Sequence, residues 1–457
     1  MMEWKFLLKP VRFKESLNKP MESDMRNEFE NDLSRIIFSS PFRRLQDKAQ
    51  VFPLEKSDFV RTRLTHSIEV STLARRIGMG VENKLILKGE IEENFRGIIS
   101  SILATSGLVH DLGNPPFGHY GEKVIQDFFK QFIQKNNKLC SFSEEEKLDF
   151  IKFDGNAHSF RILKKLDYLS DEHSYNLTYP ILATIIKYPR SSKEGNKEIE
   201  GKSSYKKFGY FQSEKESYKK MMKELKMEVE GEEKRHPLVF LLEAADDIAY
   251  LVGDIEDGCK KGILSKEQIL KAFKEELGEF NSEDKKLLKE LQAIKVEEHY
   301  IDELEIFMRV LRIKLQAKMV DAIIETFIEK HDEILKGEFD SDLLDYSRVK
   351  NIKKACKKLS YKIFKNKEIL KTEISGGIII SFLLKEFTEA VISEDKEDSK
   401  TKEGKLYNLI SNNYRFLSNR YPYENKIYND LQLVTDYICG MTDSYAIDLY
   451  KRLKGIE

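Results

Sequence analysis

Four residues with metal-binding side chains occur in a fixed order along the chain: His66, the adjacent pair His110 and Asp111, and Asp246. Imidazole nitrogen suits Mn, Fe, Ni or Zn, and carboxylate oxygen suits Mg or Mn. Two imidazoles and two carboxylates can hold one divalent cation and leave positions open for water and substrate. A cation held in this way lowers the pKa of water and polarises a phosphoryl oxygen. The residue types therefore predict a metal site suited to hydrolysis of a phosphate ester.

The pair His110 and Asp111 needs a helix end to reach one metal. Neighbouring helical residues diverge by about 100°, so both can contact one cation only in a groove or at a terminus. They follow an apolar helical stretch, and the segment 113–116, Gly-Asn-Pro-Pro, ends it. Proline lacks a backbone donor and disfavours helix in the residue before it. We therefore expect the pair to be accessible at a helix terminus.

The other two ligands are expected on two further helices. His66 follows Thr62 and Thr65, either of which could cap its helix, and Asp246 follows Ala244 and Ala245 in mid-helix. The small alanines allow another helix to approach closely, and a carboxylate facing that contact requires a cationic partner. Three apolar residues are expected to anchor the helix of His66: Ile68, Leu73 and Ile77.

The chain as a whole predicts a mostly α-helical fold. Apolar residues recur at intervals of three and four, most clearly in 236–258, 266–295, 303–336 and 406–417. A small two-stranded element is expected near 205–213, where aromatic residues cluster. The polar segments 190–204 and 394–405 are expected to be loops. We divide the chain into a catalytic part, 1–260, and a helical part, 261–457, that packs on it and contributes to subunit contacts.

The composition excludes several classes of protein. Among 457 residues, 34% are charged and the formal net charge is −1, so no global field marks a nucleic-acid or membrane binder. No apolar run approaches the roughly 20 residues of a membrane helix, and the first residues lack the pattern of a signal peptide. The four cysteines are scattered without a CxxC pair, which fits a reducing cytoplasm.

The sequence motifs around the metal-binding residues resemble those of one family of enzymes. RTRLTHSIEV (61–70), LVHDLGNPPFGHYGE (108–122) and EAADDIAYLVGDIEDG (243–258) are similar to the HD-domain phosphohydrolases, and more narrowly to the deoxyguanosine triphosphate triphosphohydrolases. The likeness begins at residue 35 and returns in GMTDSYAIDLYKRL (440–453). No motif of that family is recognised in segment 261–425. The resemblance implies an HD-type helical fold and hydrolysis of a dNTP to a deoxynucleoside and tripolyphosphate.

The resemblance also assigns expected roles to individual residues. It implies that His66, His110, Asp111 and Asp246 bind one divalent metal (Mn, Mg or Fe), and a second Mg could accompany the triphosphate. His119 and Glu122 correspond to a catalytic His and Glu, and a hydrogen bond between them would suit proton transfer to the leaving oxygen. The expected substrate contacts are Gln50, Val51, Arg63, Lys187, Tyr188, Tyr250 and Asp254. The role of His158, where the family commonly has Gln, is left open.

Two other functions remain as alternatives. One is an HD-type phosphatase or phosphodiesterase acting on monophosphates, cyclic dinucleotides or guanosine tetraphosphate. The other is a regulatory protein that binds single-stranded nucleic acid, for which the lysine-rich segment 350–367 is the candidate surface. The resemblance implies a homo-oligomer, with a hexamer favoured over a tetramer, and no membrane partner. A preference for dGTP over other dNTPs is not encoded in the ligand types.

Overall fold

The fold is mostly α-helical, as the periodicity predicts. The computed structural model describes residues 1–15, 24–52, 59–136, 141–167, 169, 171–277, 282–294 and 302–456. The helices of the first half are α1 (Trp4–Leu7), α2 (Glu28–Ile37), α3 (Ser40–Arg44), α4 (Arg63–Leu87), α5 (Ile98–Val109), α6 (Gly118–Lys135), α7 (Glu144–Ile151), α8 (Gly155–Arg161), α9 (Tyr179–Ile185), α10 (Lys215–Glu224) and α11 (Pro237–Lys260).

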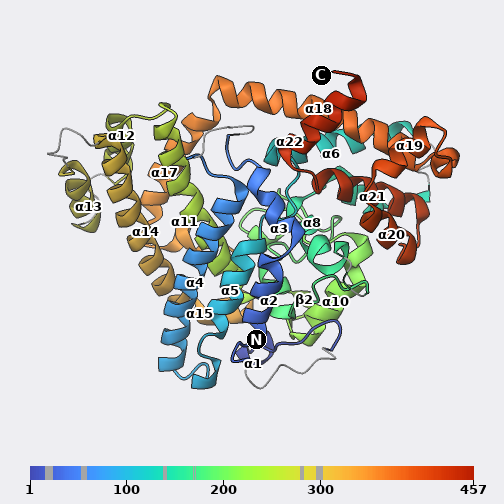
Figure 1. Cartoon of the computed structure of the whole chain (residues 1–457). Coiled ribbons are helices and arrows are strands. Elements are labelled where there is room, and N and C mark those ends of the chain that lie inside the picture. The colour runs from blue at the N-terminus through green and yellow to red at the C-terminus, as the bar shows by residue number, and fades with distance from the viewer. Residues whose placement is uncertain are drawn as a thin grey trace.

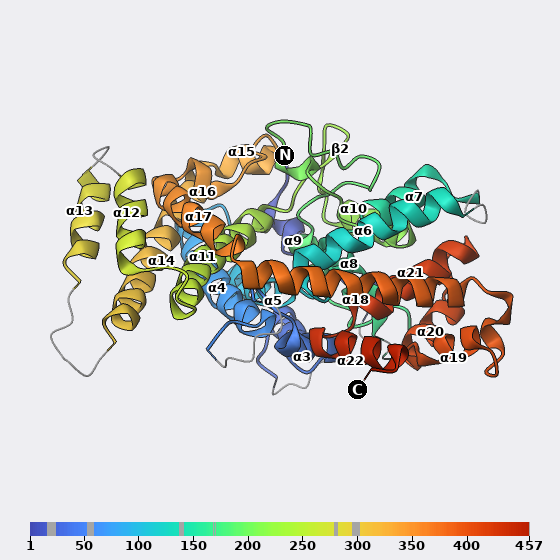
Figure 2. The ribbon, with the colours of Figure 1, turned by 90° about the horizontal axis from the view of Figure 1, so that it is seen from above.

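The second half adds a further set of helices, which extend the molecule at both ends. They are α12 (Lys266–Leu277), α13 (Ser282–Gln292), α14 (Glu303–Glu329), α15 (His331–Lys336), α16 (Leu343–Tyr346), α17 (Lys350–Phe364), α18 (Lys367–Val391), α19 (Lys402–Leu409), α20 (Asn412–Arg420), α21 (Lys426–Cys439) and α22 (Asp443–Lys454). In the view from above, α12 and α13 lie at one end and α19 and α20 at the other (Figure 2).

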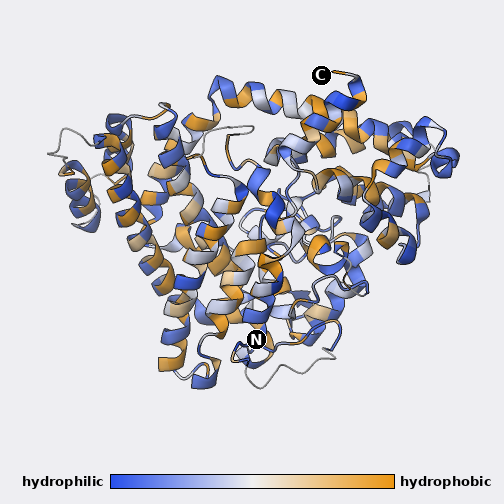
Figure 3. Cartoon of the chain, viewed as in Figure 1, coloured by the Kyte–Doolittle hydropathy of each residue, from blue (hydrophilic) through white to orange (hydrophobic). Residues whose placement is uncertain are grey.

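The centre of the molecule is a bundle of long helices. Helix α4 packs against α5, α11 and α14, and α11 also packs against α17 (Figure 1). Apolar residues dominate these central helices, whereas α19 and α20 are largely polar (Figure 3). Helix α18 crosses the top of the molecule and packs against α6, α21 and α22. Helix α18 therefore covers the helix that carries His119, and α21 and α22 pack on α18.

Glycine permits the closest approach within the bundle. A Cβ atom on Gly107 of α5 would lie 2.6 Å from the Cα of Ser71 in α4, a distance that real Cβ atoms do not occupy. Residue Gly107 lies three positions before His110, and Ser71 lies five positions after His66. This contact therefore sets the separation of the two helices that carry the predicted imidazole ligands.

Several expectations about individual elements need correction. Segment 205–213 forms no strand pair. Its ends belong to short 3-10 helices at Ser203–Tyr205 and Gln212–Glu214, while the two described strands are β1 (Glu228–Val229) and β2 (Glu232–Glu233). The expected loop 394–405 contains a 3-10 turn and the start of α19. Ile68 is 48% exposed and does not anchor α4, whereas Leu73 and Ile77 are buried.

Among the described helices, none combines the length and apolar character needed to cross a membrane.

Candidate metal centre

The four predicted ligands lie together where three helices meet. His66 is in the first turns of α4, His110 and Asp111 directly follow α5, and Asp246 is in the middle of α11. The ligand atoms of the two imidazoles and Asp111 lie within 4.8 Å of one another. The Oδ1 atom of Asp246 is 3.1 Å from Nε2 of His66 and 3.4 Å from Nε2 of His110.

Local sequence explains how these side chains are presented. Thr62 caps α4, and its hydroxyl and that of Thr65 exchange hydrogen bonds with each other's backbone amides. Of the two candidate caps, Thr62 is therefore the N-cap. Helix α5 ends at Val109, so His110 and Asp111 occupy its terminus as the Gly-Asn-Pro-Pro segment predicts.

The orientation of His110 fits a metal ligand. Its Nδ1–H donates to the carbonyl of Gly107 at 2.8 Å, which fixes the ring and leaves Nε2 with its lone pair. That Nε2 atom is buried and makes no hydrogen bond within the part of the chain that the structure describes. A buried acceptor without a donor is costly unless a cation uses it. The donor set of two imidazoles and two carboxylates therefore fits a divalent metal.

Two cations hold the carboxylates in their ionised form. Arg63 Nη1 is 2.5 Å from Asp111 Oδ2, and Lys187 Nζ is 3.2 Å from Asp246 Oδ2. Burial alone would raise the pKa of both carboxyls, but these cations and the nearby imidazoles outweigh it and hold each pKa below its usual range. The carboxylates are thus ionised and able to bind a cation, and a basic side chain lies against each of them.

His119 and Glu122 lie in a cleft beside the metal ligands, but they do not pair as expected. Glu122 is buried, and its carboxylate accepts hydrogen bonds from Lys207 Nζ at 2.9 Å and from the backbone amide of Gly155 at 3.0 Å. Lys207 also lies 2.5 Å from Asp154. No hydrogen bond joins Glu122 to His119, and the imidazole is exposed in the cleft. The sequence-based expectation of a His–Glu hydrogen bond is therefore wrong.

Lys207 and Asp154 belong to this cleft and had no role in the sequence reasoning. With His119 and Glu122 they line a cavity of about 460 Å³. Burial and the charge of Asp154 raise the pKa of Glu122, while Lys207 opposes that shift. Partial burial and the cations Arg63 and Lys207 lower the pKa of His119. Asp154 lies in the sequence segment DGNAH and Lys207 in the segment KKFG. Both residues could have been identified from these two segments.

Tyr250 and Asp254 follow Asp246 along one stripe of α11, as their spacing predicts. The ring of Tyr250 is half-buried and stacks on Phe364 at the end of α17, with ring centroids 6.3 Å apart. Asp254 is buried beneath it, beside Tyr250 and Ser360. Burial and then the charge of Asp257 raise the pKa of Asp254 to about 8. Phe364 lies in the segment that carried no recognised motif.

The remaining predicted contacts flank the metal ligands. Arg63 and Lys187 bond directly to two of them, and Tyr188 is half-buried beside Lys187. Gln50 is half-buried, its Oε1 atom has no hydrogen-bond partner among the described residues, and Val51 is 7% exposed. Their segment reaches the metal helix through a β-bridge from Ala49 to Thr62.

His158 has a structural contact in this fold. It is fully buried, with Nδ1 at 3.1 Å from the carbonyl of Gly113 and Nε2 at 3.3 Å from Asp436 of α21. Asp436 also accepts two hydrogen bonds from Arg161. His158 therefore links the loop after the metal ligands to a late helix, and it lies behind the cleft.

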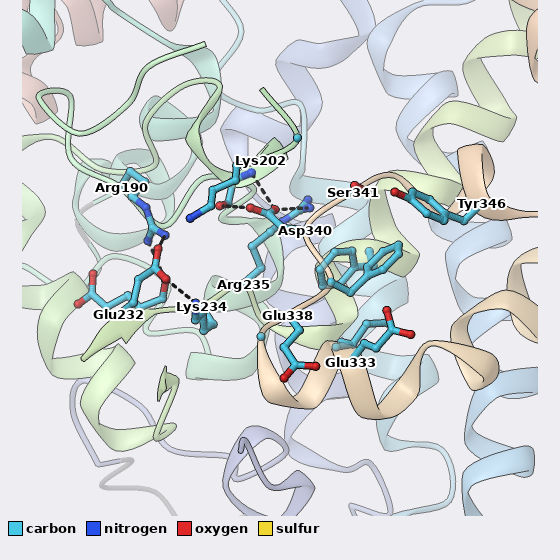
Figure 4. A pocket seen from close by; sticks show the side chains of 17 residues that line it. Arg190, Lys202, Glu232, Lys234, Arg235, Glu333, Glu338, Asp340, Ser341 and Tyr346 are labelled. Atoms are coloured by element: carbon cyan, nitrogen blue, oxygen red, sulfur yellow. Dashed lines mark hydrogen bonds and ion pairs between the residues drawn. The ribbon is translucent and has the colours of Figure 1, made fainter. Parts of the chain in front are cut away.

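A second cavity, of about 320 Å³, lies where the 190–204 segment and the β-hairpin meet the α15–α16 connection. Several of its charged side chains are paired, as Figure 4 shows for Glu232, which lies 2.5 Å from both Arg190 and Lys234. Asp340 accepts hydrogen bonds from the amide and hydroxyl of Ser204. None of the predicted site residues lines this cavity.

Comparison with known proteins gives consistent results. The HD domain profile matches residues 63–251, and the phosphohydrolase-associated domain profile matches residues 383–452. A protein of Listeria innocua named deoxyguanosinetriphosphate triphosphohydrolase-like is 43% identical over the full length of both chains. A protein of Synechocystis with that name is 34% identical over the full length of both. A deoxyguanosinetriphosphate triphosphohydrolase of Serratia proteamaculans is 31% identical over 98% of both chains.

Proposed function

The chain belongs to the deoxyguanosinetriphosphate triphosphohydrolase family of HD-domain proteins, and from that membership we propose that it hydrolyses dGTP, and other dNTPs, to a deoxynucleoside and tripolyphosphate. The observation that carries the proposal is the meeting of His66, His110, Asp111 and Asp246 with two cationic side chains already placed against the carboxylates.

The proposed reaction breaks the bond between the α-phosphorus and the nucleoside 5′ oxygen. Water attacks the α-phosphorus, its oxygen enters the tripolyphosphate, and the 5′ oxygen leaves with a proton. A divalent metal at the four ligands supplies Lewis-acid polarisation of a phosphoryl oxygen and lowers the pKa of water. Mn, Mg and Fe all agree with the ligand types.

The chain's own residues would bind and orient the substrate. Arg63 and Lys187 would receive the phosphates, since a triphosphate can replace the carboxylates as their partner. His119, exposed in the cleft, would give a proton to the departing 5′ oxygen. Glu122 does not contact His119 directly. It would therefore influence this proton transfer through its hydrogen bond with Lys207 and through the electrostatic potential in the cleft.

The sugar and base would lie between two walls. Tyr250, held by Phe364, would pack against the deoxyribose and disfavour a 2′-hydroxyl. Gln50 and Val51 would contact sugar and base from the opposite side, and Oε1 of Gln50, which no described residue contacts by a hydrogen bond, would be an acceptor for that purpose. Tyr188 would lie on the phosphate side with Lys187, and Asp254 would act from beneath Tyr250.

The test is incubation of the purified protein with each dNTP and with GTP, in Mn²⁺ and in Mg²⁺, with ion-exchange separation of the products. We expect deoxynucleoside and tripolyphosphate in equal amounts, and in H₂¹⁸O the label is expected in tripolyphosphate alone. His110→Ala and Asp246→Ala should abolish turnover. Release of monophosphate or stepwise release of phosphate would favour the other HD-type hydrolases. No turnover of single nucleotides or of mixtures, together with salt-dependent binding of single-stranded DNA, would favour the regulatory alternative.

A further inference from the structure

One buried carboxylate from the C-terminal part of the chain contacts both walls of the proposed site. Asp443, the first residue of α22, is 2% exposed. Its Oδ2 accepts a hydrogen bond from the amide of Ala49 at 3.0 Å, and its Oδ1 accepts one from the amide of Phe117 at 3.0 Å. Each oxygen therefore serves a different segment of the site.

The two donors adjoin residues with expected roles in substrate binding and proton transfer. Ala49 directly precedes Gln50 and Val51. Phe117 directly precedes α6, which presents His119, and it holds a left-handed backbone conformation with φ 60°. A non-glycine residue adopts that conformation at a cost, so surrounding contacts must hold it there. The hydrogen bond to Asp443 is one such contact, and the close packing of the Phe117 ring against Gly376 of α18 is another.

A second buried side chain holds the same region from the other side. Lys48 is 3% exposed, and its Nζ donates to the carbonyl of Asn114 at 2.7 Å and to that of Cys439 at 2.6 Å. Cys439 ends α21, four residues before Asp443. The start of α22 and the end of α21 thus contact the segment before Gln50 and the loop before α6.

We infer that Asp443 is a positioning residue that fixes the distance between the 48–51 segment and the start of α6. It touches no reacting atom. Its effect on turnover rests on the proposed function, because that function places the sugar and base against one segment and the leaving oxygen against the other. A displacement of about 1 Å between such groups can cost roughly 100-fold in rate.

The informative variant is Asp443→Asn, which keeps the shape but leaves only one acceptor oxygen for two amide donors. We expect faster amide hydrogen exchange in peptides covering 48–52 and 113–120, with the rest of the chain unchanged. We also expect kcat to fall roughly 10- to 100-fold while KM changes by less than about threefold. The affinity for Mn²⁺, measured by calorimetry, should stay within about twofold of wild type, because no metal ligand is touched.

Lys48→Met serves as a second variant with the same expected signature, so the test does not depend on one protein folding. Asp32→Asn is the matched control. Asp32 is a fully buried carboxylate that also accepts a backbone amide, that of Thr178 at 2.8 Å, but it holds α2 rather than the site. The Asp32→Asn variant should be less stable than wild type and should have the same kcat.

The outcomes separate this inference from the proposed function. Unchanged exchange in both peptides of Asp443→Asn, or a loss of kcat no larger than in Asp32→Asn, would overturn the positioning role. If wild-type protein hydrolysed no dNTP, the proposed function would fail, and the exchange measurement would still decide whether Asp443 holds the two segments in place.

Discussion

At the scale of single residues, a buried acid in the proposed site reduces the stability of the fold. The pKa of Asp254 is raised to about 8, by burial first and by Asp257 second. An unfolded aspartate ionises near pH 3.9, so the folded state holds an extra proton between about pH 4 and pH 8. The stability that this group contributes is therefore full below about pH 4 and is lost as the pH rises toward 8.

Asp254→Asn should therefore stabilise the protein, and more so at pH 8 than at pH 5. The difference in the free energy of unfolding between Asp254→Asn and wild type is expected to be larger at pH 8 than at pH 5, by about 1 kcal/mol or more. Denaturant unfolding at both pH values measures it. The control is Asp448→Asn, because Asp448 is exposed and its substitution should leave stability unchanged at both pH values. Asp443 is unsuitable as a control because it accepts hydrogen bonds from two backbone amides. A pH-independent difference would contradict the assignment of a raised pKa.

Lys187 offers a second residue-scale prediction, because its charge acts on metal and substrate in opposite directions. Its ammonium lies 3.2 Å from Asp246 and competes with a cation for that carboxylate. Lys187→Met should tighten Mn²⁺ binding by roughly 3- to 10-fold and raise the KM for dGTP by at least as much. Calorimetry and steady-state kinetics measure the two effects. Lys123→Met, which removes an exposed ion pair to Asp127, should change neither.

The sequence predicted well which four residues would meet at the proposed metal site, because each occurs in a specific motif and at a position that local rules decide. The Thr62 cap and the helix end before His110 depend on neighbouring residues alone. The partner of Glu122 could not be predicted in the same way, because Lys207 is distant in the sequence and reaches it only through the tertiary fold. The contact of His158 with Asp436 depends on residues 278 positions apart.

At the scale of elements, local breaks in a helical pattern were harder to find than the pattern itself. Among the described residues, the stretch 266–295 is divided into α12 and α13, and the stretch 303–336 into α14 and α15. The short hairpin lies at 228–233, where Glu230 and Gly231 both have positive φ, as a tight two-residue hairpin turn requires. The aromatic residues at 205–213 suggested strands but serve as buried packing instead, since Phe208, Tyr210 and Phe211 belong to the core.

The contact between α4 and α5 predicts a link between packing and metal affinity. Gly107→Ala places a methyl group 2.6 Å from the Cα of Ser71, so the helices must separate. We expect a loss of about 1–3 kcal/mol in stability and weaker Mn²⁺ binding, because His66 and His110 would move apart. Thermal unfolding and calorimetry test it. In Gly80→Ala the new methyl meets only the side chain of Ile324, and metal affinity equal to wild type is expected.

At the scale of the whole molecule, one face of α18 is exposed among the residues that the structure describes. Its inner face packs on α6, while Leu370, Ile374 and Ile378 are 44%, 58% and 57% exposed at intervals of four residues. The homo-oligomer remains a prediction, and we propose this face as part of its contact. The division of the chain at residue 260 also remains a proposal, although α11 does end there and α17 packs directly on it.

Light scattering after size exclusion tests the oligomer. Wild type should elute as an assembly, and the double change Ile374→Glu with Ile378→Glu should shift it toward smaller species. Ile313→Glu, at a 63% exposed position on α14, is the control and should leave the assembly intact. A monomeric wild type at every concentration would contradict the prediction.

The lysine-rich helix α17, the candidate surface for single-stranded nucleic acid, has fewer unpaired positive charges than its sequence suggests, because Lys353 and Lys358 are paired with acidic residues.

The contact of Asp443 with Ala49 also has a meaning for synthesis of the protein. These residues are 394 positions apart, and a ribosome adding about 5–20 residues per second needs about 20–80 s to cover that stretch. All four metal ligands emerge well before the residue that holds the 48–51 segment and α6 in register. The contact that we infer to position the proposed site therefore forms only after translation has reached α22, so a nascent chain that already contains every predicted ligand still lacks this positioning contact.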